Sequence, residues 1–184
     1  MVLLHSEKPR LGIAAPDFSL KSVDGKSYSL ASFKDKKVLV LMFICNHCPY
    51  VQAIEDRIIA FAKEVAPKGV QVVGICSNDP TDYPEDSPEN LKKRWQAKQY
   101  GFPYLIDETQ ETAKAYGAIC TPDIYAFDSK RKLVYRGQLD NNWQDPRKVT
   151  RQDLKEAVEA ILAGKSPSEP QIPSMGCSIK WKKR

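Results

Sequence analysis

The stretch VLVLMFICNHCPYV, residues 38–51, places two cysteines at the boundary between two hydrophobic patterns. Residues 38–44 form a continuous apolar run of strand length, which is typical of a central strand buried on both faces. From Pro49 onward, apolar residues recur at helical spacing until Pro67 and Gly69 end the pattern. The sequence therefore predicts that a buried strand passes into a helix through the cysteine pair.

Segments that alternate between strand and helix patterns follow this stretch. Residues 70–76 form a second buried strand, and a loop rich in proline and aspartate runs from Ser77 to Ser87. Ser87 and Pro88 are typical of the cap and first residue of a helix, which we expect to run to about Tyr100. The later predicted elements are a short strand at 104–106, a short helix at 108–116, a hairpin of strands at 124–127 and 133–139, and an amphipathic helix at 150–163.

Another hairpin is predicted near the amino end, where residues 18–20 and 27–29 flank the pair Asp24-Gly25. The order of βαβ units, then an antiparallel pair and a helix, predicts an α/β sandwich with a mixed sheet. We place one domain at residues 1–164 and an extended carboxyl-terminal tail at 165–184. Because the tail ends in apolar residues, we expect it to dock on the domain.

The composition excludes several classes of function. With 42% hydrophobic and 28% charged residues, the chain has the composition of an ordinary globular protein. The net charge of +5 comes without a basic groove lined by aromatic residues, so no nucleic-acid partner is expected. No apolar run reaches membrane-spanning length and the amino end lacks the apolar core of a signal peptide, so we expect a cytoplasmic protein with no membrane partner.

The cysteines carry the chemical signal. The chain has five, Cys45, Cys48, Cys76, Cys120 and Cys177. In a reducing compartment a close pair indicates redox chemistry or metal binding more often than a permanent disulfide. Cysteines three residues apart on a first helical turn can close a disulfide, and a helix amino terminus stabilises a thiolate. His47, as an imidazolium, would favour a thiolate beside it; the alternative is a pair of inert buried thiols with a histidine that caps the helix.

Three segments together resemble the thioredoxin-like superfamily, in its peroxiredoxin-like branch related to AhpC/TSA. They are Gly12 to Phe18, the strand into Cys45-Asn46-His47-Cys48, and Tyr116 to Pro122 before a strand. The likeness covers about residues 10 to 163. It implies a three-layer α/β/α sandwich with a central mixed sheet and an amino-terminal hairpin extension.

The same resemblance implies roles for residues outside the pair. The Thr121-Pro122 bond would be cis and would face the cysteines, where it offers a strand-like edge on which a substrate's extended chain can pair. Thr121 and Pro122 would then support the catalytic residues Cys45 and Cys48. Cys120 could lie close to either of them or be a small buried hydrophobe.

Two subfamilies make different predictions about the pair. As in thiol-disulfide oxidoreductases, Cys45 would be the exposed nucleophile and Cys48 would resolve the mixed disulfide. As in peroxiredoxins, Cys48, which precedes Pro49, would be the peroxidatic cysteine, although Cys45 replaces the usual threonine and Cys120-Thr121-Pro122-Asp123 stands where an arginine is expected. Pro49 also predicts that Cys48 caps the helix and that Cys45 stands outside it, which conflicts with the order in which Cys45 attacks first.

Thiol-disulfide exchange is the function that the sequence favours, and peroxide reduction is the alternative. A third hypothesis is that Cys45 and Cys48, with His47 or Cys120, bind a soft metal, although we expect neither a metal nor another cofactor. The expected partners are a protein disulfide or a small thiol or peroxide substrate, together with an external thiol reductant, in a monomer or homodimer. Cys177 could reach the site from the docked tail as a further redox thiol, or be an accessory thiol with packing neighbours.

The strand that enters the cysteine pair is entirely apolar, whereas thioredoxins carry a buried acid on the corresponding strand. Proton transfer would therefore depend on His47, on water or on a residue elsewhere in the chain. We expect slower exchange than in a true thioredoxin.

Overall fold

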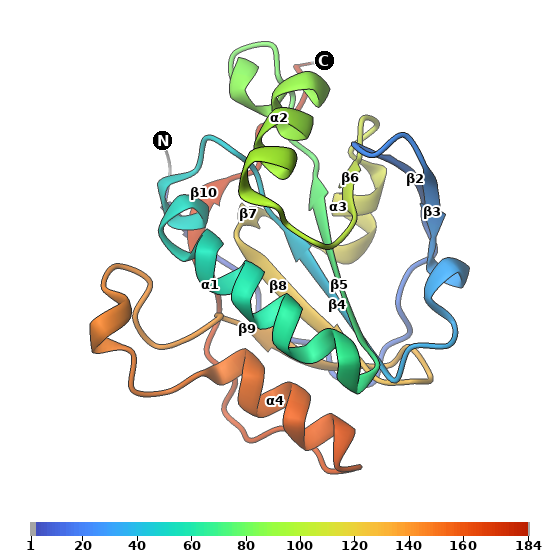
Figure 1. The fold of residues 1–184 in the computed structure, drawn as a ribbon. Helices are drawn as coiled ribbons and strands as arrows, with labels where there is room; N and C mark the ends of the chain where they lie inside the picture. The colour runs from blue at the N-terminus through green and yellow to red at the C-terminus, as the bar shows by residue number, and fades with distance from the viewer. Residues whose placement is uncertain (1–2, 184) are drawn as a thin grey trace.

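A seven-stranded mixed sheet runs through the centre of the computed structural model, which describes residues 3–183 (Figure 1). Its strands are, in spatial order, β3 (Ser27–Ser29), β2 (Ser19–Ser22), β6 (Tyr104–Ile106), β5 (Val70–Cys76), β4 (Val38–Phe43), β8 (Asp123–Phe127) and β9 (Leu133–Gly137). The pairs β4–β5 and β5–β6 are parallel, and the other neighbours are antiparallel. Met1, Val2 and Arg184, which the predicted domain and tail include, lie outside the described residues.

Helices cover both faces of this sheet, because β4 sends successive side chains to opposite sides. Val38, Val40 and Met42 pack in one apolar cluster, and Leu39, Leu41 and Phe43 pack in another. The helices are α1 (Pro49–Val65), α2 (Pro88–Lys98), α3 (Glu111–Tyr116) and α4 (Asp153–Leu162), with 3-10 turns at Leu30–Phe33, Ala66–Lys68, Pro84–Asp86 and Pro146–Lys148. The first cluster takes apolar residues from α1, α2 and α4, and the second takes them from α3. This three-layer arrangement confirms the predicted fold class.

A second, three-stranded sheet joins distant parts of the chain. It consists of β1 (Leu3–His5), β10 (Met175–Ser178) and β7 (Cys120–Thr121), paired antiparallel with β10 in the middle. The carboxyl-terminal segment therefore docks as a strand, next to the point where β4 passes into α1 (Figure 1).

The boundaries of several elements differ from the sequence prediction for local reasons. The helix expected from residue 108 begins at Glu111, because Gln110 has a positive φ of 64° and the Asp107 carboxylate accepts hydrogen bonds from Thr112 N and Ala113 N. The helix α2 ends at Lys98, because Gln99 is left-handed with a φ of 52°. Within residues 3–183, the structure has no helix that is both long enough and apolar enough to cross a membrane.

Candidate active site

The cysteine pair lies in the turn between β4 and α1. Cys48 is the N-cap residue of α1 and has extended backbone geometry, and Pro49 is the first helical residue. Proline disfavours helical geometry in the residue before it, which explains why the helix begins here. Cys45 stands outside the helix, and both thiols are buried, with 2% of Cys45 and 0% of Cys48 exposed.

The Cys48 sulfur is surrounded by groups that stabilise its thiolate. A hydrogen bond from the Cys45 thiol lowers the pKa of Cys48 to about 5; burial opposes this, and bonds from the Cys177 thiol and the Val51 backbone add to it. The Cys48 and Cys177 sulfurs are 3.0 Å apart. When it is protonated, the Cys48 thiol can instead donate to the Thr121 carbonyl oxygen at 3.1 Å.

Cys45 has the opposite character, although it lies in the same turn. Burial raises its pKa well above the ordinary value, and the hydrogen bond to Cys48 and the negative charge of Asp86 add to the shift. Its sulfur lies 3.2 Å from the Thr121 hydroxyl oxygen. The pKa values of the two cysteines of the turn are thus shifted in opposite directions, downward for Cys48 and upward for Cys45.

Asp86 holds the turn in place from the loop before α2. Its carboxylate accepts hydrogen bonds from Asn46 N at 2.7 Å, His47 N at 3.2 Å and the Asn78 amide at 2.8 Å. It also lies 2.5 Å from His47 Nδ1. Burial disfavours its ionised form, but the bonds from His47 and Asn78 outweigh burial and lower its pKa. Sequence reasoning noticed the aspartate-rich loop but not this residue, because no local pattern reports which of its acids turns inward.

His47 is fixed on both sides of its ring. Asp86 binds Nδ1, and the Tyr83 ring stacks on the imidazole with 4.4 Å between ring centroids. In the described part of the chain, Nε2 is buried without a hydrogen-bond partner. One potential metal-ligand atom from each of Cys45, His47 and Asp86 lies within 4.8 Å of the other two. The Asp86 oxygens are already engaged by three neighbouring residues, so a metal ion would have to compete with this network.

The other predicted residues lie across the site from the pair. The Thr121-Pro122 bond is cis, as the resemblance implied, and Thr121 reaches both cysteines through its hydroxyl and carbonyl groups. The Cys120 thiol donates instead to the Pro122 carbonyl oxygen, at 3.8 Å, and burial raises its pKa. Cys177, in β10, is the further cysteine whose sulfur the structure brings against Cys48.

The profile of the AhpC/TSA family matches residues 11–136, which is more than half of the chain and includes every residue of the β4–α1 turn. The chain belongs to the AhpC/TSA family. It is an oxidoreductase with a thioredoxin-like fold.

Named relatives of this AhpC/TSA protein fall into two groups. The thiol-disulfide oxidoreductase ResA of Bacillus thuringiensis subsp. konkukian is 29% identical over 130 residues, which cover 70% of this chain and 69% of ResA. The chloroplastic peroxiredoxin Q of Populus jackii is 30% identical over 147 residues and 72% of this chain, which spans only 62% of that protein. Both of the subfamilies that the sequence suggested are thus represented.

Solved structures support the fold over the whole chain. An uncharacterized conserved protein from Geobacillus kaustophilus is 48% identical, with a TM-score of 0.94 over 100% of this chain and 98% of its own. The thioredoxin domain of a thiol-disulfide oxidoreductase from Bacteroides vulgatus has a TM-score of 0.60 at 19% identity, over 71% of this chain and 89% of that domain. The second likeness concerns the fold alone.

Strand β9 of this AhpC/TSA protein carries a buried arginine, Arg136. Arg136 donates to the buried Asp123 carboxylate at 2.7 Å and to the Gly117 carbonyl oxygen at 2.8 Å. Its guanidinium also lies over the Tyr125 ring. These bonds commit Arg136 to a buried ion pair.

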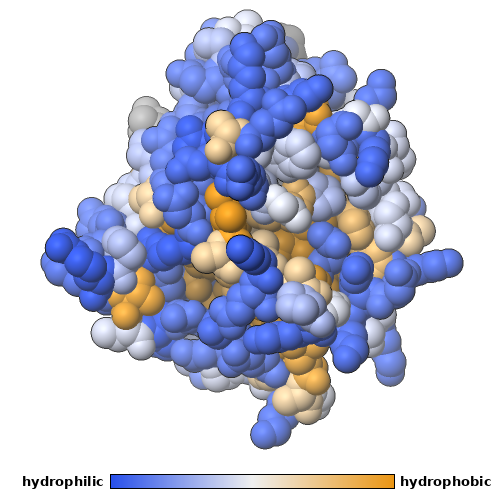
Figure 2. Space-filling model, in the orientation of Figure 1, coloured by the Kyte–Doolittle hydropathy of each residue, from blue (hydrophilic) through white to orange (hydrophobic). Residues whose placement is uncertain are grey.

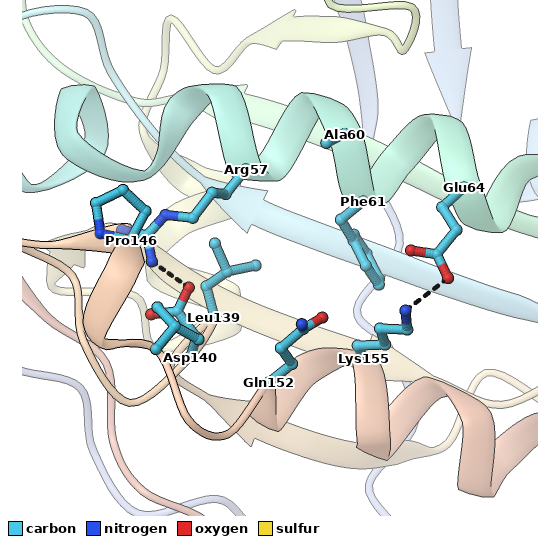
Figure 3. Close-up of a pocket in the computed structure, with 10 residues that line it drawn as sticks. Arg57, Ala60, Phe61, Glu64, Leu139, Asp140, Pro146, Gln152 and Lys155 are labelled. Carbon is cyan, nitrogen blue, oxygen red and sulfur yellow. Dashed lines mark hydrogen bonds and ion pairs between the residues drawn. The ribbon is translucent and has the colours of Figure 1, made fainter.

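A separate groove lies between α1 and α4, away from the cysteines (Figure 3). Its lining includes Phe61 and Leu139, and hydrophobic surface shows between the two helices on an otherwise mainly hydrophilic face (Figure 2). Arg57 binds Asp140 across one part of it, and Lys155 binds Glu64 at 2.8 Å across another. The residues that line the groove include no cysteine.

Proposed function

We propose that this protein catalyses thiol-disulfide exchange, with Cys48 as the attacking thiolate and Cys45 as a resolving thiol. The observation that carries the proposal is the position of Cys48 at the N-cap of α1, with its sulfur 3.0 Å from the Cys177 sulfur; the lowered pKa of Cys48, beside a Cys45 thiol whose pKa is raised, supports it. A thiolate is the reactive form of cysteine, and Cys48 is ionised at neutral pH. This reverses the order of attack that the sequence favoured, and it agrees with the position that Pro49 gives Cys48 as the helix cap.

In the proposed reaction, the Cys48 thiolate attacks one sulfur of a substrate disulfide and expels the other as a thiolate. Cys45 then attacks the Cys48 sulfur of the mixed disulfide, releases the second substrate thiol and closes the Cys45–Cys48 disulfide. An external thiol reductant restores the two thiols. Each cycle moves two electrons from the reductant to the substrate.

Cys45 must lose a proton before it can attack, and its raised pKa makes this step demanding. Besides Cys48, two titratable residues lie close by: His47 and Asp86 each have an atom within 4.8 Å of the Cys45 sulfur. We propose that the His47–Asp86 pair receives this proton, in place of the acid that the apolar strand β4 lacks. The pair thereby provides the proton acceptor that thioredoxins carry on the strand.

Trapping tests the order of attack. A Cys45→Ser/Cys177→Ser variant, which lacks both thiols next to Cys48, should hold a substrate as a mixed disulfide on Cys48, and a Cys48→Ser variant should hold none. Peptide mapping by mass spectrometry after incubation with oxidised glutathione reads both outcomes. Capture on Cys45 in the Cys48→Ser variant would instead make Cys45 the nucleophile.

Peroxide reduction at Cys48 is the second candidate, and the same thiolate followed by Pro49 favours it. The commitment of Arg136 to Asp123 weighs against it. Stoichiometric consumption of hydrogen peroxide that persists in Cys45→Ser and disappears in Cys48→Ser would select this function. The partners that we propose are accordingly a protein disulfide, a small thiol or a peroxide, in a reducing compartment such as the cytoplasm; fractionation of cells that express the protein tests the location.

A further inference from the structure

β10 occupies the free edge of β7, beside the cysteine turn. The register pairs Cys177 with Thr121 and Ser178 with Cys120. Gly176 makes the approach close: a Cβ atom at this position would lie 1.9 Å from the Thr121 carbonyl oxygen and 2.6 Å from its carbonyl carbon. Only a residue without a side chain allows the two backbones to lie so near each other.

This edge is where the resemblance places the extended chain of a substrate, and here the protein's own carboxyl-terminal segment fills it. The sulfur of Cys177 lies 3.0 Å from that of Cys48, and 1% of Cys177 is exposed. Thr121 therefore contacts three cysteines. Its backbone pairs with Cys177, its hydroxyl group contacts the Cys45 sulfur, and its carbonyl oxygen contacts the Cys48 sulfur. A disulfide requires about 2.0 Å between sulfurs, so the Cys48 and Cys177 sulfurs need to approach by only about 1 Å.

The pKa values of Cys48 and Cys177 are shifted in opposite directions, as suits an attacking thiolate and a neighbouring thiol. Burial raises the pKa of Cys177 to about 12, and the bond to Cys48 adds to this. Cys177 thus remains a thiol that can donate to the Cys48 thiolate. The arrangement stabilises the attacking sulfur while the site is closed, and it keeps a second thiol in contact with that sulfur.

We propose that Cys177 is a third redox-active cysteine, which forms a disulfide with Cys48, and that β10 is a displaceable strand whose place on β7 a substrate chain takes. The proposal rests on the proposed exchange function. β10 leaves the edge, the substrate chain pairs with β7, and Cys48 attacks the substrate disulfide. The substrate chain, still bound to Cys48, then leaves the edge, and β10 returns. The Cys177 sulfur then attacks the Cys48 sulfur; the Cys48–substrate bond breaks, the Cys48–Cys177 bond forms, and the departing substrate thiolate takes the proton of Cys177. The substrate disulfide is the two-electron oxidant in this sequence.

Disulfide mapping tests the bond directly. Reduced protein is treated with one equivalent of oxidised glutathione, quenched in acid, digested and analysed by mass spectrometry. We expect a peptide pair that joins Cys48 to Cys177, in the wild-type protein and in Cys45→Ser. A Cys120→Ala variant, which removes the neighbouring buried thiol of β7, should retain it. Formation of the Cys45–Cys48 bridge alone, with Cys177 reduced throughout, would overturn the proposal.

A double variant separates this inference from the proposed function. Cys45→Ser/Cys177→Ser has no resolving thiol, so Cys48 should retain glutathione as a mixed disulfide. Retention of glutathione without any Cys48–Cys177 bridge in the other proteins would leave exchange at Cys48 standing and reject the role of Cys177. Absence of glutathione from Cys48 would reject both.

Displacement of β10 is tested through Gly176. A Gly176→Val side chain collides with the Thr121 carbonyl group and should release the strand, so that alkylation of Cys48 by iodoacetamide speeds up by about tenfold or more as protection by the docked strand is lost. Ser168→Val adds an apolar side chain at an exposed position of the same tail and should leave the rate unchanged. Equal rates in a folded Gly176→Val protein would contradict the displaceable strand; if this variant does not fold, the mapping of the wild-type protein still decides the role of Cys177.

Discussion

The two sheets of this protein differ in what holds them together and in what they do. The seven-stranded sheet has β4 in its interior, between β5 and β8; all six residues of β4 are buried, and aliphatic and aromatic side chains cover both faces of the strand. The three-stranded sheet has strands of two to four residues and positions the sulfur of Cys177 and the backbone of Thr121. The comparison teaches that stability and reactivity are carried by different parts of the chain, which can be perturbed separately.

The largest effect that we expect is a dependence of stability on pH that belongs to Cys48. Its pKa is about 5 when folded and 9.0 as an ordinary thiol, so the thiolate contributes fully to stability above pH 9. The contribution falls as the pH drops from 9 to 5, because in this range the unfolded chain binds a proton that the folded chain does not. Urea unfolding of reduced wild type and Cys48→Ser between these values measures the difference, and parallel curves would contradict it.

Truncation of a buried side chain in the large sheet should give the next largest effect on stability. Leu41 is fully buried in β4, and Leu41→Ala should lower the free energy of unfolding by about 2–5 kcal/mol. Leu3, in β1 of the small sheet, is 50% exposed, and Leu3→Ala should change it by less than about 0.5 kcal/mol. Denaturant titration gives both values. Equal losses of unfolding free energy in the two variants would contradict the idea that the large sheet carries the stability.

Asp86→Asn should affect both stability and reactivity, because Asp86 binds the cysteine turn between β4 and α1. Loss of the charged acceptor for Asn46 and His47 should cost about 1–3 kcal/mol of stability. Removal of the negative charge should also lower the pKa of Cys45, which burial still holds high. Thiolate absorbance in a Cys48→Ser background follows this titration. Asp82→Asn, an exposed acid of the same loop, is the control, and an unchanged Cys45 midpoint would argue against electrostatic coupling.

The smallest effect on the site is expected from the groove between α1 and α4. Arg57 binds the buried Asp140 and the Asn142 and Trp143 carbonyl oxygens, so Arg57→Gln should cost about 1–3 kcal/mol of stability. The Cys48 midpoint should stay near 5, because Arg57 lies outside the cysteine turn. A shift of that midpoint, measured by thiolate absorbance, would show that the two regions are linked.

The large sheet could be predicted because its signals are local. The apolar run of β4, the helical spacing from Pro49 and the caps at Ser87 and Pro88 each lie within one element. Pro49 also placed Cys48 correctly at the helix cap. The part of the fold that patterns in short windows can specify was therefore recovered, with differences of a few residues at helix ends.

The small sheet and the inward-facing acid could not be predicted in the same way. The pairing of Cys177 with Thr121 joins segments far apart in the chain, and β7 has only two residues. Asp86 is buried against the cysteine turn, whereas Asp79 and Asp82 in the same loop are not buried, and no local pattern in the sequence separates the three acids. The relative acidity of Cys45 and Cys48 depends on these contacts, and for this reason the order of attack could not be read from the spacing of the cysteines.

The position of β10 near the end of the sequence also has a consequence during synthesis of the protein on the ribosome. Cys48 and Cys177 are 129 residues apart, so β4, α1 and most of the large sheet are synthesised well before β10 emerges. During that interval we expect Cys48 to be uncovered and without one of the two thiols that hold its charge. The nascent chain would then pass through a stage in which its most reactive sulfur is open to any oxidant or disulfide nearby, and completion of the last strand would end that exposure.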